Sequence, residues 1–288
     1  MTDTPRLHPT DHPSPRRRFF ARENLLTLFA VALLLLVLGL WLWLTPSGLL
    51  GKADAVGYAV CHRIDARSFH FPGGRQTPLC ARCSGTFLGV LVGLCGPGLL
   101  FRRRRRAGMF PPIGLLAVMV GASALWAFDG ANSYAHLLPE GVPRLYTPHN
   151  WLRLTTGMFH GITMGSLVLP VFNATIWAEA NRERTLGRLH ELLILYAIGA
   201  ALIVLVLTEQ PIVLYPLALL SAVGTVAILA TVNTLIVAMV IQRENASHTW
   251  REALPVVLFG LVVTILMIGA IDAVRFALFR SWDGFSIG

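Results

Sequence analysis

Charged residues are scarce in this chain of 288 residues: Asp, Glu, Lys and Arg make up only 14% of it, against 55% hydrophobic residues. A soluble globular domain usually carries about 25% charged and 45–50% apolar residues. The shortage therefore argues against an ordinary soluble domain. It indicates a chain whose apolar residues face lipid, where backbone groups must be satisfied within helices or closed barrels.

Motifs of several enzyme classes are also missing. The sequence contains no P-loop, no dinucleotide-binding glycine fingerprint, no H-E-x-x-H pair and no serine-hydrolase elbow. ATP-driven and classical protease functions therefore have no support. No internal repeat of the kind that many transporters carry is evident.

Long apolar runs are abundant, and seven of them approach the roughly 20 residues that a membrane-spanning helix needs. They lie at about 25–44, 84–101, 112–128, 155–177, 191–208, 212–241 and 253–279. We predict an all-α integral membrane protein, a bundle of about seven transmembrane helices over residues 25–288. The first run exceeds the roughly 7–15 apolar residues of a signal peptide, so we expect a retained helix behind a disordered, basic cytoplasmic tail at 1–24.

The formal net charge of +9 comes from arginines that cluster between the apolar runs. This pattern is typical of topology signals rather than of a surface that follows nucleic-acid phosphates, so we expect the lipid bilayer as partner and no nucleic acid. Most Lys and Arg residues lie in the tail and in the loops after the second, fourth and sixth runs. The excess predicts a multi-pass protein of the inner (plasma) membrane with its N-terminus in the cytoplasm.

Cysteine is rare, yet three of the four cysteines lie in one polar segment. Residues 58–85 read YAVCHRIDARSFHFPGGRQTPLCARCSG and contain Cys61, His62, His70, Cys80 and Cys83. The segment belongs to the connection at 45–83, which we expect on the extracytoplasmic side. The Cys80-x-x-Cys83 pair directly precedes the second predicted helix.

This segment resembles the signature of a family of uncharacterised bacterial and archaeal predicted membrane proteins, the domain of unknown function 2085. The matching residues are Cys61, His62, Arg67, Ser68, Phe69, Cys80, Arg82, Cys83 and Gly85. Asp129-Gly130, and Arg153 with Gly157, are similar to two further pairs of the family. The resemblance covers roughly residues 55–165 and implies a membrane protein, but no activity.

A metal site is the first interpretation of these cysteines. Cys61, Cys80 and Cys83 with one of His62 or His70 would form a Cys3His set, which suits tetrahedral zinc. A C-x2-C pair binds one ion well, with further ligands from about twenty residues upstream.

Two alternatives remain open. A C-x-x-C pair at a helix N-terminus has a lowered thiol pKa, so Cys80 and Cys83 could act as a membrane thiol–disulfide oxidoreductase that uses quinone, with Cys61 as the exchanging partner. Such enzymes usually have a second outer cysteine pair, however, and Cys95 lies about 18 Å down a helix. Alternatively, Cys61 forms a structural disulfide with Cys80 or Cys83.

A second set of polar residues is expected at the same membrane depth. The candidates for catalysis are Asp129, Arg153, His160 and Asp272, and their predicted neighbours are Asn132, His136, Asn150, Glu209 and Arg275. Ionisable groups in a membrane usually face a bundle interior or a water-filled cavity.

These groups have a functional and a structural interpretation. Lining one pocket beside the cysteines, Asp129 or His160 could accept a proton or bind the metal, and Arg153 could bind an anionic headgroup. As structural pairs, Asp272 would neutralise Arg275 at i, i+3, and Asp129 would neutralise Arg153.

Three classes of function follow for the whole chain. The first is a membrane-embedded metal-binding protein that binds zinc or a similar ion and whose activity the sequence does not specify. The second is an enzyme at the outer face, either the thiol–disulfide oxidoreductase or a lipid-modifying enzyme. The third is a transporter or accessory subunit with a structural cysteine loop. A small-molecule or lipid ligand fits each of them, and the sequence identifies no protein partner.

Overall fold

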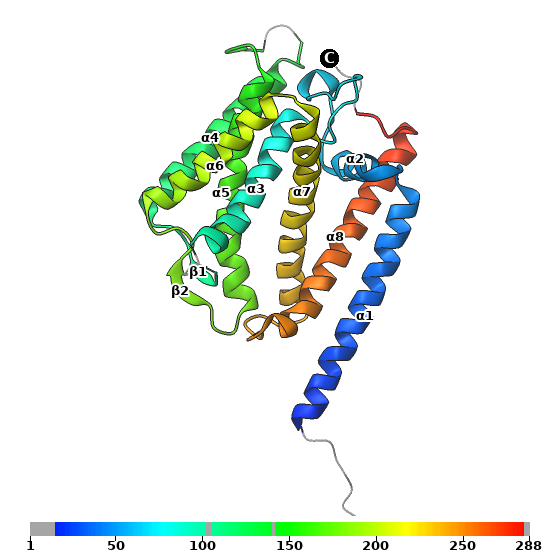
Figure 1. Cartoon of the computed structure of the whole chain (residues 1–288), viewed down its shortest axis with the longest axis vertical. Coiled ribbons are helices and arrows are strands. Elements are labelled where there is room, and N and C mark those ends of the chain that lie inside the picture. The colour runs from blue at the N-terminus through cyan, green and yellow to red at the C-terminus, as the bar shows by residue number, and fades with distance from the viewer. Residues whose placement is uncertain (1–14, 102–104, 140–141, 285–288) are drawn as a thin grey trace, which may run out of the picture.

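A computed structural model describes residues 15–101, 105–139 and 142–284 of the chain. Its elements, in chain order, are α1 (Pro15–Leu44), α2 (Gly48–Val60), the 3-10 turn η1 (Asp65–Arg67), α3 (Ala81–Leu100), β1 (Ala107–Met109), α4 (Ile113–Ala135), α5 (Asn150–Ile176), β2 (Asn181–Arg184), α6 (Leu189–Leu207), α7 (Pro211–Val240) and α8 (Trp250–Phe279). Within these residues, seven helices are long and apolar enough to cross a membrane. The predicted all-α fold is therefore confirmed (Figure 1).

Three helices extend further into polar sequence than the apolar runs predict. Helix α3 begins at Ala81, α4 continues to Ala135, and α5 begins at Asn150. Each added stretch contains polar side chains that bond to other helices, so burial there is compensated. As a result Cys83, Asp129 and Arg153 are all helical residues.

The connection predicted at 45–83 contains the short helix α2, which apolar run length does not indicate. Its 13 residues are too few to span a bilayer. Ala53, Ala55, Val56 and Tyr58 are buried, and α2 packs on α7 and α8. The predicted tail at 1–24 lies partly outside the described residues, which begin with α1 at Pro15.

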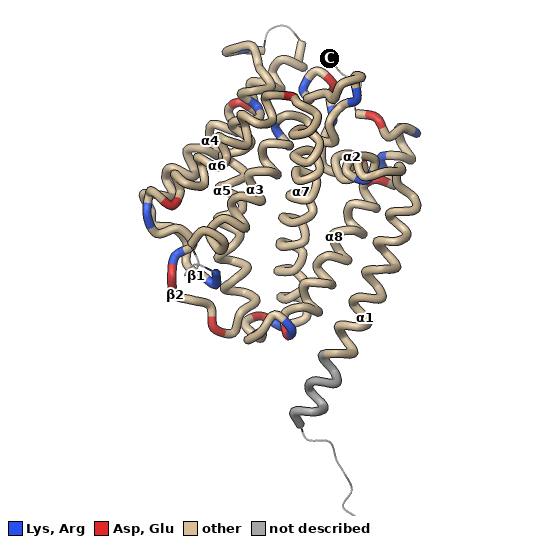
Figure 2. The backbone as a smooth tube through the Cα atoms, in the orientation of Figure 1, with Lys and Arg blue, Asp and Glu red and all other residues tan. Residues whose placement is uncertain are grey.

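The loops of the bundle gather at two ends. Strands β1 and β2 pair in parallel, and Trp177 forms a β-bridge with Ser247, so the loops after α3, α5 and α7 meet at one end. The segment 61–80 and the residues that follow α8 lie at the other end (Figure 1). Figure 2 shows that charged residues are concentrated near these two ends, with long uncharged stretches of helix between them.

Helices α3 and α5 make the most extensive contact between helices of the described residues. Six glycines at four-residue spacing form it: Gly85, Gly89, Gly93, Gly157, Gly161 and Gly165. A Cβ atom added at these glycines would lie between 1.9 and 2.5 Å from a backbone carbonyl oxygen of the other helix. Small residues allow such backbone contact between membrane helices. The contact places the first turn of α3, with its cysteines, beside the first turn of α5.

Candidate functional site

Three thiols and one imidazole converge where α2 ends and α3 begins. Cys61 directly follows α2, Cys80 is the residue before α3, and Cys83 lies in the first turn of α3. The ligand atoms of Cys61, His62 and Cys80 lie within 4.8 Å of one another. The thiols of Cys61 and Cys83 hydrogen-bond to Cys80, and all three cysteines are free. We call Cys61, His62, Cys80 and Cys83 the Cys/His cluster.

The surroundings of the Cys/His cluster favour a thiolate. The backbone N–H groups of Arg63 and Cys80 each donate to Cys61 Sγ at 3.4 Å. Hydrogen bonds, the larger contribution from Cys61 and the smaller from Cys83, lower the pKa of Cys80 well below its usual range. The hydrogen bond to Cys80 raises the pKa of Cys61 to about 12. Within the cluster, Cys80 is therefore the thiol that ionises most readily, and the thiolate is the form of cysteine that binds metals.

The two candidate histidines occupy different places. His62 is half-buried beside the thiols, and its Nδ1 accepts a hydrogen bond from the backbone N–H of Ile64 at 3.0 Å. His70 lies outside this group, and its Nε2 is 2.8 Å from Oδ1 of the exposed Asp65. Of the two, the structure therefore places His62 with the cysteines.

Arg82, between Cys80 and Cys83 in the sequence, connects the Cys/His cluster to helix α4. Its guanidinium forms an ion pair with Asp129, which is 1% exposed, and donates to Ser133 Oγ at 2.9 Å. The hydroxyl of Tyr146 donates to the other oxygen of Asp129 at 2.7 Å. The ion-pair partner of Asp129 is thus Arg82, where the sequence suggested Arg153.

Two more arginines approach the same end of α4. Arg153 donates to Asn150 Oδ1 at 2.8 Å and to Ser133 Oγ at 3.4 Å. Arg67 donates to the backbone oxygen of Ser133 at 2.8 Å. Burial, and then the positive charge of Arg82, lowers the pKa of Arg67. Three guanidinium groups therefore surround Ser133 and carry more positive charge than Asp129 neutralises.

The loop between α4 and α5 is held so that Tyr146 reaches Asp129. Asn132 donates from Nδ2 to the backbone oxygen of Tyr146 at 2.8 Å and accepts at Oδ1 from the N–H of Leu145 at 2.9 Å. His136 Nε2 lies 3.0 Å from the same oxygen of Tyr146. Burial, and then the hydrogen bond to Asp129, raises the pKa of Tyr146 to about 12. Sequence reasoning missed Tyr146, because no motif marks it.

His160 and Glu209 lie apart from this network. His160 Nδ1 is 3.0 Å from Ser123 Oγ, and its ring stacks on Trp126 with centroids 4.1 Å apart. Glu209 is an exposed residue between α6 and α7.

Asp272 and Arg275 have different partners. Asp272 accepts a hydrogen bond from Trp41 of α1 at 3.1 Å. Arg275 donates to the backbone oxygen of Cys61 at 2.8 Å and lies 4.0 Å above the ring of Tyr58. The polar residues expected in a single pocket are therefore divided between the Arg82 network, the His160–Trp126 stack and the α1–α8 interface.

One part of the chain contains most of the features described above: the cysteine pattern, Arg82, Asp129 and the glycine contact. Residues 61–167 match the family described as Predicted membrane protein (DUF2085). The resemblance expected from the cysteine motif is thereby confirmed over this segment. It spans the Cys/His cluster and all three glycines that α5 contributes, whereas Trp41 and Asp272 lie outside it.

A curated relative covers much of the same region. The chain is 28% identical over 125 residues to Uncharacterized protein MJ1492 of Methanocaldococcus jannaschii, which is 43% of this chain and 71% of the relative. No solved structure matches the chain. These similarities support a membrane protein and leave its chemistry to be argued from the residues.

Proposed function

We propose that this membrane protein binds one divalent metal ion, zinc in the first instance, at Cys61, His62, Cys80 and Cys83. The observation that carries the proposal is the convergence of ligand atoms from three of these residues within 4.8 Å. In a tetrahedral site with Zn–S bonds of about 2.3 Å, two sulfurs lie about 4 Å apart. Small side-chain movements would bring the thiols to that separation.

The donor set favours zinc over harder ions. Thiolate and imidazole ligands suit zinc, whereas calcium and magnesium prefer oxygen ligands. The two backbone N–H groups that donate to Cys61 Sγ would orient a bound thiolate, as outer-shell groups do in metal sites.

The charge around the Cys/His cluster also suits a metal–thiolate centre. Three thiolates and one Zn²⁺ carry a net charge of about −1. Arg67, Arg82 and Arg153 bring three positive charges to the neighbouring end of α4, opposed there by the carboxylate of Asp129. The positive excess would stabilise the centre, and Arg67 and Arg153 both interact electrostatically with Cys80.

Bound metal would fasten the end of α2 to the start of α3. Cys61 and Cys80 bracket an irregular segment with the single short turn η1. Its internal backbone hydrogen bonds are those of η1 and of the hairpin around the His70–Gln76 bridge, and none of them joins its two ends. A metal crosslink between those ends would therefore contribute to its folding. We therefore propose that the bound ion stabilises the fold at this end of the protein.

Elemental analysis with thiol counting on detergent-purified protein tests the proposal. We expect about one zinc per chain and free thiols in the wild type and in Cys95→Ser, because Cys95 is exposed on α3. Zinc should be lost in Cys80→Ser/Cys83→Ser. Absence of metal, with a cysteine pair that reacts only after reduction, would instead favour the thiol–disulfide oxidoreductase or a structural disulfide, which a quinone-reduction assay separates.

We further propose that the Cys/His cluster faces the outside of the inner (plasma) membrane, with the N-terminus in the cytoplasm. Its support is the arginine content of the opposite end, where Arg105 and Arg106 adjoin strand β1. A C-terminal alkaline phosphatase fusion should be active and a C-terminal green fluorescent protein fusion dark. The reverse pair of results would invert the orientation.

A further inference from the structure

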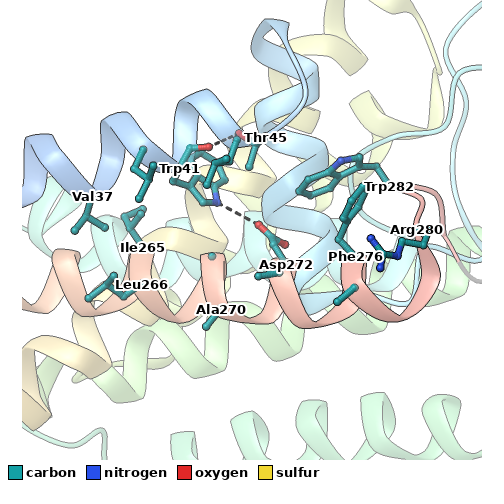
Figure 3. A pocket seen from close by; sticks show the side chains of 15 residues that line it. Val37, Trp41, Thr45, Ile265, Leu266, Ala270, Asp272, Phe276, Arg280 and Trp282 are labelled. Atoms are coloured by element: carbon teal, nitrogen blue, oxygen red, sulfur yellow. Dashed lines mark hydrogen bonds between the residues drawn. The ribbon is translucent and has the colours of Figure 1, made fainter.

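A cavity of about 620 Å³ lies between α1 and α8 (Figure 3). Its lining is almost wholly apolar and includes Val37, Leu40, Trp41, Ile265, Leu266 and Phe276. Leu40 and Leu266 are 53% and 52% exposed, so the cavity borders surfaces that face lipid. Its size falls within the roughly 300–1,000 Å³ of small-molecule sites. A molecule dissolved in the bilayer could enter from the side.

One buried carboxylate interrupts this apolar lining. Asp272 is 3% exposed, and Trp41 Nε1 donates to its Oδ2 at 3.1 Å (Figure 3). Its other oxygen, Oδ1, has no hydrogen-bond partner among the described residues and is itself buried. Buried polar atoms are nearly always paired, so this oxygen indicates a missing donor.

We propose that the cavity binds an uncharged long-chain amphiphile whose hydroxyl group donates a hydrogen bond to Oδ1 of Asp272. The apolar chain would lie between α1 and α8 against Val37, Ile265 and Leu266. Long-chain alcohols and hydroxyl-bearing lipids share this chemistry. The inference does not depend on the metal site.

The charges at the cavity select a neutral head group. Arg280 lines the cavity, and Arg275 lies one turn beyond Asp272 on α8. These cations disfavour an ammonium head group, and the carboxylate disfavours an anionic one. A hydroxyl satisfies the open oxygen without bringing another charge into the membrane.

The closing experiment compares octadecanol with methyl octadecyl ether, which has a similar chain and no donor. Full-length protein in detergent micelles is incubated with each probe at equal mole fraction, and native mass spectrometry counts the molecules retained. We expect about one octadecanol per chain and roughly tenfold weaker retention of the ether, as for one hydrogen bond to a charged group.

Three variants locate the site and identify the donor contact. Ala273→Phe fills the cavity and leaves Asp272 in place, so retention of both probes should fall; Val274→Phe adds the same bulk at a 62% exposed position of α8 and should change neither. In Asp272→Asn the amide oxygen would accept from Trp41, which leaves N–H groups toward the ligand. The preference for the alcohol should then disappear.

Several results would overturn the proposal. They are equal retention of both probes by the wild type, retention of neither, a preference that survives Asp272→Asn, or Ala273→Phe matching Val274→Phe. Ala273→Phe keeps the test decisive even if Asp272→Asn does not fold. Zinc content, measured on the same samples, reports on the metal site separately.

Discussion

The helix pairs α3–α5 and α1–α8 are packed in opposite ways. Between α3 and α5, glycines bring the two backbones into direct contact. Between α1 and α8, larger side chains such as Trp41 and Phe276 leave a cavity of about 620 Å³. The backbone contact between α3 and α5 fixes the relative position of their first turns, as a polar site requires. The side-chain contact between α1 and α8 leaves space for a small molecule. The family match covers all of α3 and most of α5, and it excludes α1 and α8.

Each pair also buries one carboxylate, and the two carboxylates differ in their partners. Asp129 is paired with Arg82 and accepts from Tyr146, so both of its oxygens have partners. Asp272 has one hydrogen bond, from Trp41, and one oxygen without a partner among the described residues. Burial alone therefore does not distinguish a structural carboxylate from one that is available to a ligand.

The largest expected effect comes from exchanging these two carboxylates for amides. Asp129→Asn leaves the charge of Arg82 uncompensated at an almost fully buried position, so we expect a loss of about 3–5 kcal/mol in stability. Asp272→Asn should lose less than about 1 kcal/mol, because the amide oxygen can still accept the hydrogen bond from Trp41. Unfolding in detergent, followed by circular dichroism, measures both. Equal losses would contradict the distinction between the two regions.

A second prediction compares glycines of the two helix pairs. Gly161→Ala would place a methyl group 1.9 Å from the carbonyl oxygen of Thr86, so the helices must separate. We expect a loss of about 3 kcal/mol or more, as for severe overpacking. Gly269→Ala on α8 meets only Trp41 Cδ1 at 3.4 Å and should change stability by less than about 1 kcal/mol.

Gly121→Ala provides the control for helix propensity. No atom lies within 4 Å of an added Cβ there, so the variant should be neutral or stabilised by about 0.5–1 kcal/mol. Thermal unfolding of all three variants in one detergent is the measurement. If Gly161→Ala behaved like Gly121→Ala, the α3–α5 contact would be looser than described.

The seven spans could be predicted from sequence because their apolar runs are long and continuous. Their polar ends could not be predicted from hydropathy. Asp129 and Arg153 belong to helices only because Arg82, Ser133 and Asn150 compensate their burial. Arg82 is 47 residues from Asp129 and Ser133 is 20 residues from Arg153, and a single sequence does not show which polar residues meet.

The cysteines of the candidate site could also be predicted from the sequence, whereas the residues that they meet in the fold could not. Cys61, Cys80 and Cys83 share a motif, and the structure brings them together. The choice of His62 over His70 depends on the turn η1 and on the pairing of His70 with Asp65, neither of which the spacing specifies. The sequence predicted Asp272 beside Asp129 because both lie at the same expected membrane depth. That prediction was wrong, since depth along a helix does not reveal which face a side chain occupies.

A third prediction concerns metal removal and depends on the proposed function. A zinc chelator should destabilise the wild type by up to about 2.7 kcal/mol relative to free zinc at a hundred times its Kd. Cys61→Ser should abolish this difference, and Cys95→Ser should retain it because Cys95 lies far from the cluster on α3. The thermal midpoint with and without chelator is the measurement. A chelator effect of equal size in Cys61→Ser would contradict the assigned ligands.

The smallest expected effect is on the stability of the protein at alkaline pH, and it comes from Tyr146. Its pKa is raised to about 12 because burial and Asp129 disfavour the phenolate. The unfolded chain ionises this phenol near pH 10, so its contribution to stability is complete below pH 10 and is lost as the pH rises to about 12. Tyr146→Phe removes the hydrogen bond to Asp129, which should cost about 1 kcal/mol at pH 8, and should make the decline between pH 10 and 12 shallower.

Unfolding free energies from pH 8 to 12, with tyrosinate absorbance recorded in parallel, test this prediction. Tyr215→Phe on α7 is the control, because Tyr215 is 39% exposed and packs near Phe71 rather than on Asp129. An identical alkaline decline in the wild type and in Tyr146→Phe would mean that the hydroxyl does not stabilise Asp129. The ion pair with Arg82 would then be the dominant support of that carboxylate, and the contrast with Asp272 would depend mainly on this ion pair.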